Sequence, residues 1–163
     1  MSTVENLKNA FAGESQANRK YLAFAKKADE EGLKQVSKLF RAAAEAETVH
    51  AHSHLRVLGG VKTTKENLQD AISGETYEFT KMYPQMIEEA KKEGNKQALQ
   101  SFENANKVEK THAGLYQKAL NNLGKNETVD YFVCQVCGHT AEKDAPDKCP
   151  VCTAPKIKFT RVS

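Results

Sequence analysis

Apolar residues recur every three or four positions through most of the first 124 residues, which is the period of an amphipathic helix. Gly32 and Gly94 each follow a charged helix-favouring ending, as residues at helix C-termini do. Ser2 and Glu5 have the spacing of a capping box. Pro84 is expected to kink its helix or to break one of its hydrogen bonds. The pattern predicts four helices, over residues 3–31, 33–58, 64–93 and 95–122.

The two halves of this helical region resemble each other. ENLKNAFAGES (5–15) aligns with ENLQDAISGET (66–76) at an offset of 61. Further along, ETVHA (47–51) aligns with EKTHA (109–113) at an offset of 62. A repeat of two helices per unit predicts a four-helix bundle with approximate twofold symmetry.

Carboxylates and imidazoles interrupt the apolar stripe of every predicted helix. A buried carboxylate costs several kcal/mol unless it is paired or bound to a metal. Two cations of charge two or three would neutralise the set, and oxygen ligands joined by imidazole nitrogens suit iron or manganese. One Glu from each of two helices and Glu-x-x-His from each of the other two is the pattern of di-iron carboxylate bundles. The predicted ligands are Glu14, Glu47, His50, Glu75, Glu109 and His112.

Glu78 is an additional member of this set and has no counterpart in the first half, where the aligned residue is Ala17. It lies one turn after Glu75, so it is predicted to reach the same metal as a seventh ligand; the alternative is a surface glutamate. Such asymmetry would let one metal exchange His50 for Glu78 as its charge changes. Tyr21 follows Glu14 by two turns, and it is a candidate hydrogen-bond donor or else a core aromatic. Tyr83, beside Pro84, is open to the same two interpretations.

All four cysteines lie in the last 30 residues, where aromatic and β-branched residues replace alanine and glutamate. Two Cys-x-x-Cys pairs form a strong signal for a tetrahedral four-thiolate site, and so short a segment depends on the metal for its fold. Gly138 would allow the positive φ of a metal knuckle. Zinc and iron both fit four thiolates, but iron is favoured beside a di-iron bundle because zinc has no redox chemistry. The predicted ligands are Cys134, Cys137, Cys149 and Cys152.

Composition and charge narrow the remaining classes. Charged residues make up 28% and hydrophobic residues 39% of the 163 residues, as in a soluble globular protein. A net charge of +3, with acidic and basic residues mixed, does not favour nucleic-acid binding. No apolar run reaches membrane-spanning length and the N-terminus lacks the pattern of a secretory signal, so a cytoplasmic location is expected. In a cytosolic chain, clustered cysteine pairs favour metal over disulfides.

These motifs together resemble the rubrerythrin family over nearly the whole chain: AFAGESQANRKY, EAETVHA, GETYEFTKMYP, EKTHA and CQVCG…CPVC. The resemblance implies a mainly α, ferritin-like di-iron domain (1–124), a linker (125–130) and a small rubredoxin-like β domain (131–163). It implies a peroxidase of oxidative-stress defence that reduces hydrogen peroxide to water. Electrons would come from rubredoxin or an NADH- or NADPH-dependent reductase and enter through the mononuclear iron. It also implies that Glu47 and Glu109 bridge two irons and that the four cysteines hold a third.

Two departures qualify the resemblance. Such cysteine knuckles often have glycine after the last Cys, where this chain has Thr153. The link at 59–63 spans at most about 18 Å, too short to cross back along a ferritin-like helix, so a domain-swapped homodimer is expected. Two other functions compete with peroxidase: a ferroxidase or iron-handling protein on the same bundle, and a non-catalytic module stapled by zinc.

Overall fold

The computed structural model describes residues 2–162. Its internal contacts divide the chain into two compact units, the first ending at Lys62 and the second beginning at Thr63. The fold is mainly α with a small three-stranded sheet near the C-terminus, as predicted. Among the described residues, no helix is long and apolar enough to cross a membrane.

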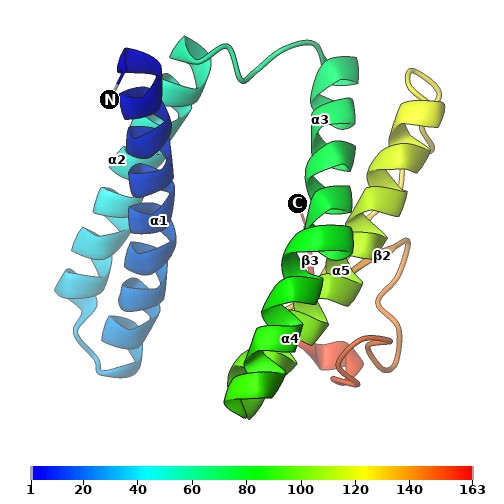
Figure 1. The fold of residues 1–163 in the computed structure, drawn as a ribbon. Helices are drawn as coiled ribbons and strands as arrows, with labels where there is room; N and C mark the ends of the chain where they lie inside the picture. Colours follow the sequence, from blue (N-terminus) through cyan, green and yellow to red (C-terminus); the bar gives the residue numbers. More distant parts are fainter. Residues whose placement is uncertain (1, 163) are drawn as a thin grey trace. The chain divides into compact units, whose positions relative to one another are not determined.

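The first unit is an antiparallel helical hairpin made of α1 (Thr3–Glu30) and α2 (Lys34–Val57), which lie side by side (Figure 1). The predicted capping box is present, because the Ser2 side chain accepts from the backbone N–H of Glu5 and the Glu5 carboxylate accepts from that of Ser2. Gly32 makes the turn with a φ of 78°. These local signals fix where α1 begins and where the turn to α2 lies.

Small side chains let the two helices of the first unit approach closely. The buried residues between α1 and α2 are mostly alanines and include one serine and one asparagine. The amide Nδ2 of buried Asn18 donates to the Ala44 carbonyl at 2.7 Å and to Thr48 Oγ1 at 2.8 Å. Several larger apolar side chains, among them Phe24 and Leu39, stay 46% and 67% exposed. The hairpin therefore buries a narrow alanine-rich seam and leaves much of its apolar surface uncovered.

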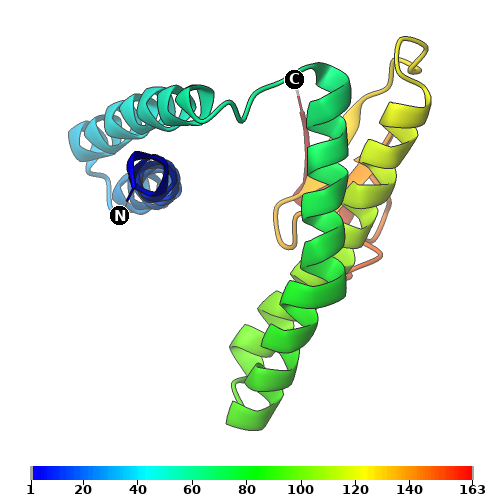
Figure 2. The same ribbon diagram turned by 45° about the horizontal axis from the view of Figure 1, so that its top comes forward.

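The second unit contains α3 (Thr64–Tyr77), a π-helical segment η1 (Glu78–Met82), α4 (Tyr83–Glu93) and the antiparallel α5 (Lys96–Asn121). Figure 2 shows α3, η1 and α4 as one continuous run beside α5. The disturbance expected near Pro84 is thus a π-helical segment just before it. The repeat offset changes from 61 to 62 within this stretch, so the second repeat has one extra residue here. A π-helix holds more residues per turn than an α-helix and can therefore accommodate that residue.

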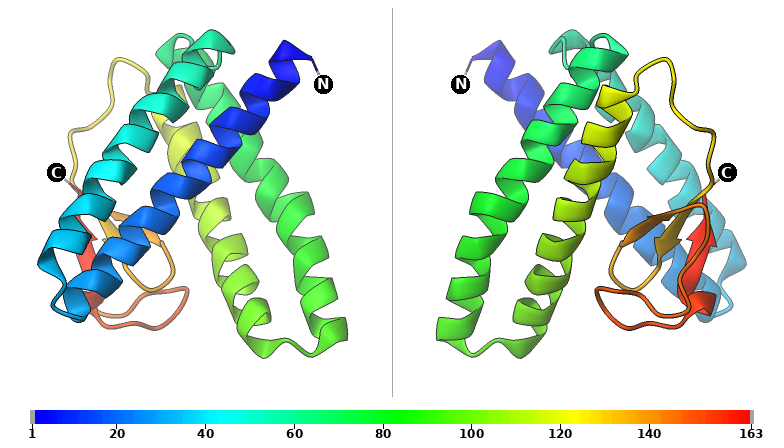
Figure 3. Two further views of the ribbon diagram at one scale, coloured as in Figure 1. Left: turned by 90° about the vertical axis from the view of Figure 1, so that its left-hand side faces the viewer. Right: turned by 90° about the vertical axis from the view of Figure 1, so that its right-hand side faces the viewer.

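The C-terminal sheet contains β1 (Tyr131–Cys134), β2 (Thr140–Glu142) and β3 (Phe159–Arg161), all antiparallel, in the order β2-β1-β3 (Figure 3). A 3₁₀ turn, η2 (Lys156–Lys158), leads into β3. Gly138 has a φ of 84°, which confirms its predicted positive φ, and Thr153 adopts the same left-handed region at 62°. The backbone of the second knuckle therefore keeps the shape that glycine would favour.

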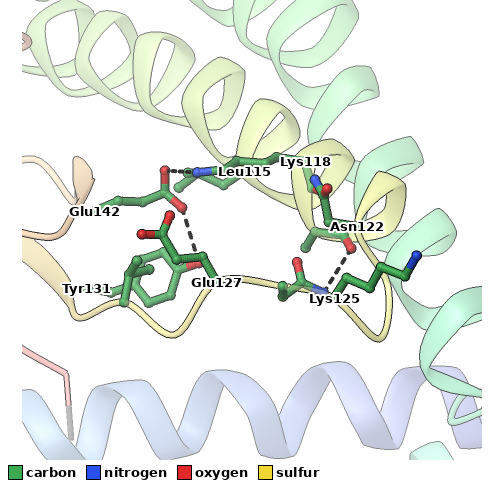
Figure 4. A pocket seen from close by; sticks show the side chains of 10 residues that line it. Leu115, Lys118, Asn122, Lys125, Glu127, Tyr131 and Glu142 are labelled. Atoms are coloured by element: carbon green, nitrogen blue, oxygen red, sulfur yellow. Dashed lines mark hydrogen bonds and ion pairs between the residues drawn. The ribbon is translucent and has the colours of Figure 1, made fainter.

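The C-terminal segment with this sheet and the four cysteines, called here the cysteine module, packs against α5 within the second unit. Lys118 on α5 forms an ion pair with Glu142 on β2, at 2.7 Å between Nζ and Oε2. This pair lines a cavity of about 170 Å³ between α5, the segment that follows it and the sheet. Figure 4 shows the pair among the other lining side chains. The contact holds β2 beside the last turns of α5.

Candidate metal centres

The first unit brings three predicted ligands together. Glu14 on α1 and Glu47 and His50 on α2 have ligand atoms that all lie within 4.8 Å of one another. Nδ1 of His50 lies 2.9 Å from Oε2 of Glu47. Hydrogen bonds from His50 and then from Glu14 lower the pKa of Glu47. The i, i+3 spacing on α2 thus produces the expected pair on one helical face, with Glu14 opposite it.

The second unit repeats this arrangement. Glu75 on α3 and Glu109 and His112 on α5 also have ligand atoms within 4.8 Å of one another. Nδ1 of His112 lies 2.8 Å from Glu109 Oε2 and 3.9 Å from Glu75 Oε1. Burial, together with the neighbouring Glu109 carboxylate, raises the pKa of Glu75 to about 7. Carboxylates held this close repel each other, and a bound cation would remove that repulsion.

We call these two clusters the first half-site (Glu14, Glu47, His50) and the second half-site (Glu75, Glu109, His112). Each offers two carboxylates and one imidazole, a donor set that fits iron. Each also supplies half of the ligands of a di-iron bundle, since the general pattern requires two Glu and two Glu-x-x-His motifs.

Glu78 lies near the second half-site but outside its tight group. It is the first residue of η1, and its carboxyl interacts electrostatically with Glu109 and His112. Burial and then the charge of Glu109 raise the pKa of Glu78. Its place as a seventh ligand stays a prediction.

The two candidate tyrosines have different surroundings. Burial and then the charges of Glu109, Glu78 and Glu75 raise the pKa of Tyr83, so the carboxylates of this region act on its phenol. Tyr21 belongs to an aromatic cluster in the first unit, with ring centroids 6.4 Å from Phe24 and 6.2 Å from Phe40. Its predicted donor role at the first half-site stays a prediction.

The four cysteines converge at one point of the C-terminal module. The Sγ atoms are 3.7 Å apart for Cys134 and Cys152 and 3.5 Å apart for Cys137 and Cys149, and all four are free thiols. A tetrahedral ion with metal–sulfur bonds of about 2.3 Å requires sulfur atoms about 3.8 Å apart, so the residues fit such an ion closely. Burial first of all raises the pKa of Cys137, so this side chain stays a neutral thiol unless a bound cation stabilises its thiolate.

Backbone donors also point at these sulfurs. Burial of Cys134 works against ionisation, but the backbone N–H groups of Val136 and Cys137 bond to its sulfur and lower the pKa of the thiol overall. A turn that aims successive N–H groups at one atom forms a small anion-binding nest. The knuckle is thus built to hold a thiolate.

Thr140 was missed by sequence reasoning. Nε2 of His112 lies 3.0 Å from Oγ1 of Thr140, which is on β2, 28 residues further along the chain. No local spacing could have revealed this contact, because it depends on how the sheet packs against α5.

Known protein families match both parts of the chain. A family model described as rubrerythrin matches residues 5–120, and one described as the rubrerythrin rubredoxin-like domain matches residues 132–160. Nigerythrin from Nitratidesulfovibrio vulgaris is 36% identical over 98% of this chain and 86% of its own length. Rubrerythrin-2 from Clostridium acetobutylicum is 33% identical over 96% of this chain and 95% of its own. A solved structure of fully reduced, all-ferrous nigerythrin matches with a TM-score of 0.61 and 35% identity, covering 99% of this chain and 87% of that one.

Proposed function

Because this chain belongs to the rubrerythrin family, we propose that it is a non-haem di-iron peroxidase that reduces hydrogen peroxide to water in oxidative-stress defence. The observation that carries the proposal is the presence, in one chain, of two matching Glu/His half-sites and a four-thiolate site. The two half-sites provide a place for two-electron chemistry, and the four-thiolate site provides a place where single electrons enter. The proposed domains are residues 1–124, the linker 125–130 and residues 131–163.

We propose two irons held by the half-sites together with Glu78, and a third iron held by the four cysteines. Zinc also fits four thiolates, but it could not pass electrons. When bound, the paired irons supply two electrons and Lewis acidity to peroxide. A solved relative described as all-ferrous supports iron at such sites in the family.

The chain's own residues would hold the ions and provide protons. Glu47 and Glu109 each contact the histidine of their half-site, at 2.9 and 2.8 Å, and they are the ligands that would bridge the two ions. Reduction of one peroxide consumes two electrons and two protons and yields two waters. Tyr83, beside the second half-site, and Tyr21, on the same face of α1 as Glu14, are the candidate donors of a hydrogen bond to the substrate. Glu78 would replace His50 as a ligand when the ion becomes more highly charged.

We propose that each complete site forms between two chains in a domain-swapped homodimer. In a ferritin-like bundle the chain must cross back along α2, which is 24 residues or about 36 Å long. The six residues between α2 and α3 reach at most about 22 Å. The exposed apolar residues of the first unit, such as Phe24 and Leu39, support a covering partner.

The electron donor would be rubredoxin or an NADH- or NADPH-dependent reductase, and the location cytoplasmic. The cysteine module supports an electron-delivery role, because four thiolates can hold iron, a redox ion, in the same chain as the two half-sites. We expect no partnership with nucleic acid or with a membrane, as the charge distribution favours neither.

The deciding experiment combines metal analysis with an anaerobic peroxide titration of the reduced protein, followed by absorbance. A peroxidase would contain about three irons per chain, and peroxide would oxidise the paired centre stoichiometrically and faster than oxygen does. Two irons and one zinc per chain, with oxygen as the faster oxidant, would instead indicate a ferroxidase with a structural cysteine module. Zinc alone would overturn both and indicate a metal-stapled interaction module.

A further inference from the structure

The two half-sites have equivalent ligands but different surroundings. His50 has a side chain that is 56% exposed, whereas the side chain of His112 is 26% exposed. The difference follows from the chain order, because the cysteine module comes after the second repeat only and packs on α5. The repeat therefore makes the ligands of the two half-sites equivalent, and the cysteine module makes their exposure to solvent different.

A short series of hydrogen bonds runs from the second half-site into the cysteine knuckle. Nε2 of His112 is 3.0 Å from Thr140 Oγ1, and that hydroxyl donates to the Gly138 carbonyl at 3.3 Å. Gly138 directly follows the ligand Cys137, and its own N–H donates to the Cys134 carbonyl at 2.8 Å. A hydroxyl that donates to a carbonyl has its oxygen lone pairs free, so towards His112 it acts as an acceptor.

This contact bears on which nitrogen of the imidazole can bind a metal. When Nε2 carries the proton and donates it to Thr140, the lone pair of the other nitrogen, Nδ1, is free to bind a metal. Nδ1 is the atom that faces the second half-site, 2.8 Å from Glu109 and 3.9 Å from Glu75. Histidine ligands generally donate their second N–H to such an outer partner, which orients the ring.

We propose that Thr140 is a positioning residue for the second half-site: its hydroxyl holds His112 with Nδ1 directed at Glu109 and Glu75, and it ties that ligand to the cysteine knuckle. The inference rests on the proposed metal-binding function of the half-sites. His112 is thereby the fixed imidazole of the pair, and the exposed His50 is the one free to leave its metal. The same hydrogen bonds join the two metal-binding regions of one chain through Thr140 and Gly138.

The test uses three variants of the full-length chain. T140V keeps the shape of the side chain and removes the hydroxyl, while T140S keeps the hydroxyl. T160V removes an exposed hydroxyl from β3 of the same sheet and serves as the matched control. Each is titrated with Co²⁺ after the cysteine site has been filled with Zn²⁺. Loss of an outer partner of a histidine ligand typically lowers metal affinity about 10- to 100-fold, and a loss of this size is expected for T140V alone.

A spectroscopic measurement separates positioning from general support. In the Zn²⁺-loaded chain labelled with ¹⁵N-histidine, the hydrogen-bonded Nε2–H of His112 should give a solvent-protected signal, assigned by its loss in H112N. The signal should persist in T140S and T160V and disappear in T140V. If T140V retains both the signal and the Co²⁺ affinity, the positioning role is wrong. If the unaltered chain takes up no Co²⁺ beyond the cysteine site, the proposed function fails instead.

Discussion

At the scale of single residues, the chain places ionisable groups where their charged forms are unfavourable unless a cation is bound. Glu75 and Glu109 are partly buried carboxylates beside one another, and the pKa of Glu75 is raised to about 7. In the cysteine module, Cys134 and Cys149 are 1% and 2% exposed. Apolar side chains would be more stable at such positions, so the presence of these residues indicates metal binding.

The raised pKa of Glu75 predicts how the stability of the metal-free chain depends on pH. Between its ordinary value of 4.5 and about 7, the folded state holds a proton that the unfolded state has lost. The stability associated with that proton is therefore full below about pH 4.5 and is lost as the pH rises to about 7. In EDTA, the Tm of the unaltered chain should fall relative to that of E75Q between pH 5 and 7 and then run parallel to it.

The control is E89Q, which changes an exposed glutamate on α4 that pairs with Lys92. Its Tm should follow the unaltered chain at every pH. Addition of Fe²⁺ at pH 8 should raise the Tm of the unaltered chain more than that of E75Q. A constant difference between the unaltered chain and E75Q from pH 5 to 8 would contradict the raised pKa of Glu75, and with it the burial of this carboxyl next to Glu109.

At the scale of elements, η1 is the feature that distinguishes the second repeat from the first. It contains Glu78, the one predicted ligand without a counterpart, and it absorbs the extra residue of the second repeat. Single π-helical turns within α-helices are frequent at functional sites. The insertion thus gives the second repeat both a seventh candidate ligand and a locally weaker helix.

Deletion of one residue within η1 should be tolerated unusually well. Removing the exposed Thr80 would let α3, η1 and α4 continue as an ordinary α-helix with its flanks in register, so helical content should be unchanged and the Tm should fall by only a few degrees. Removing Ala105 from the middle of α5 is the control. It would rotate the rest of that helix by about 100° and turn Glu109 and His112 away from Glu75. Circular dichroism melting compares the two; equal destabilisation would contradict the interpretation of η1 as an inserted residue.

Local signals explain how much of these elements could be predicted. Capping residues, glycines and the 3.6-residue period lie close together in the sequence, and each predicted helical run contains helix in the structure. Both Glu-x-x-His pairs and the four cysteines have a fixed spacing, so their clusters were predictable too. The π-helical form of η1 and the contact of Thr140 with His112 were not. The first depends on how an extra residue is accommodated, and the second joins residues 28 apart through tertiary packing.

At the scale of the whole molecule, the proposed ligands fall into two units that each hold one half-site. A domain-swapped dimer would combine the first half-site of each chain with the second half-site of its partner. An alteration in the first half-site of one chain would then affect only one of the two complete sites of the dimer, because each site uses a different half of each chain.

Mixed dimers distinguish swapped from unswapped assembly. One chain carries E14A and E47A in its first half-site, and the other carries E109A and H112A in its second. Neither homodimer has an intact site. In a swapped heterodimer one site combines both altered halves and the other combines both unaltered halves, so one complete site returns. Metal analysis of heterodimers purified with two different tags should find that single di-iron site.

Two chains altered in the same half-site serve as the control and should recover none. Recovery of no site in the first mixture would show that each chain builds its site from its own halves.

Every cysteine lies in the last 30 residues, and this position affects how long the protein stays active. If the protein is the peroxidase proposed above, it would meet peroxide at each turnover, and its helical region contains no cysteine for peroxide to oxidise. The four in the knuckle are shielded while a metal holds them as ligands. Once the ion is lost, the sulfur atoms of two thiol pairs lie 3.5 and 3.7 Å apart. Each pair can be oxidised by one hydrogen peroxide to one disulfide and two waters. A disulfide no longer binds the metal. Metal retention in this small module, and not the durability of the helices, would then set the working lifetime of the protein.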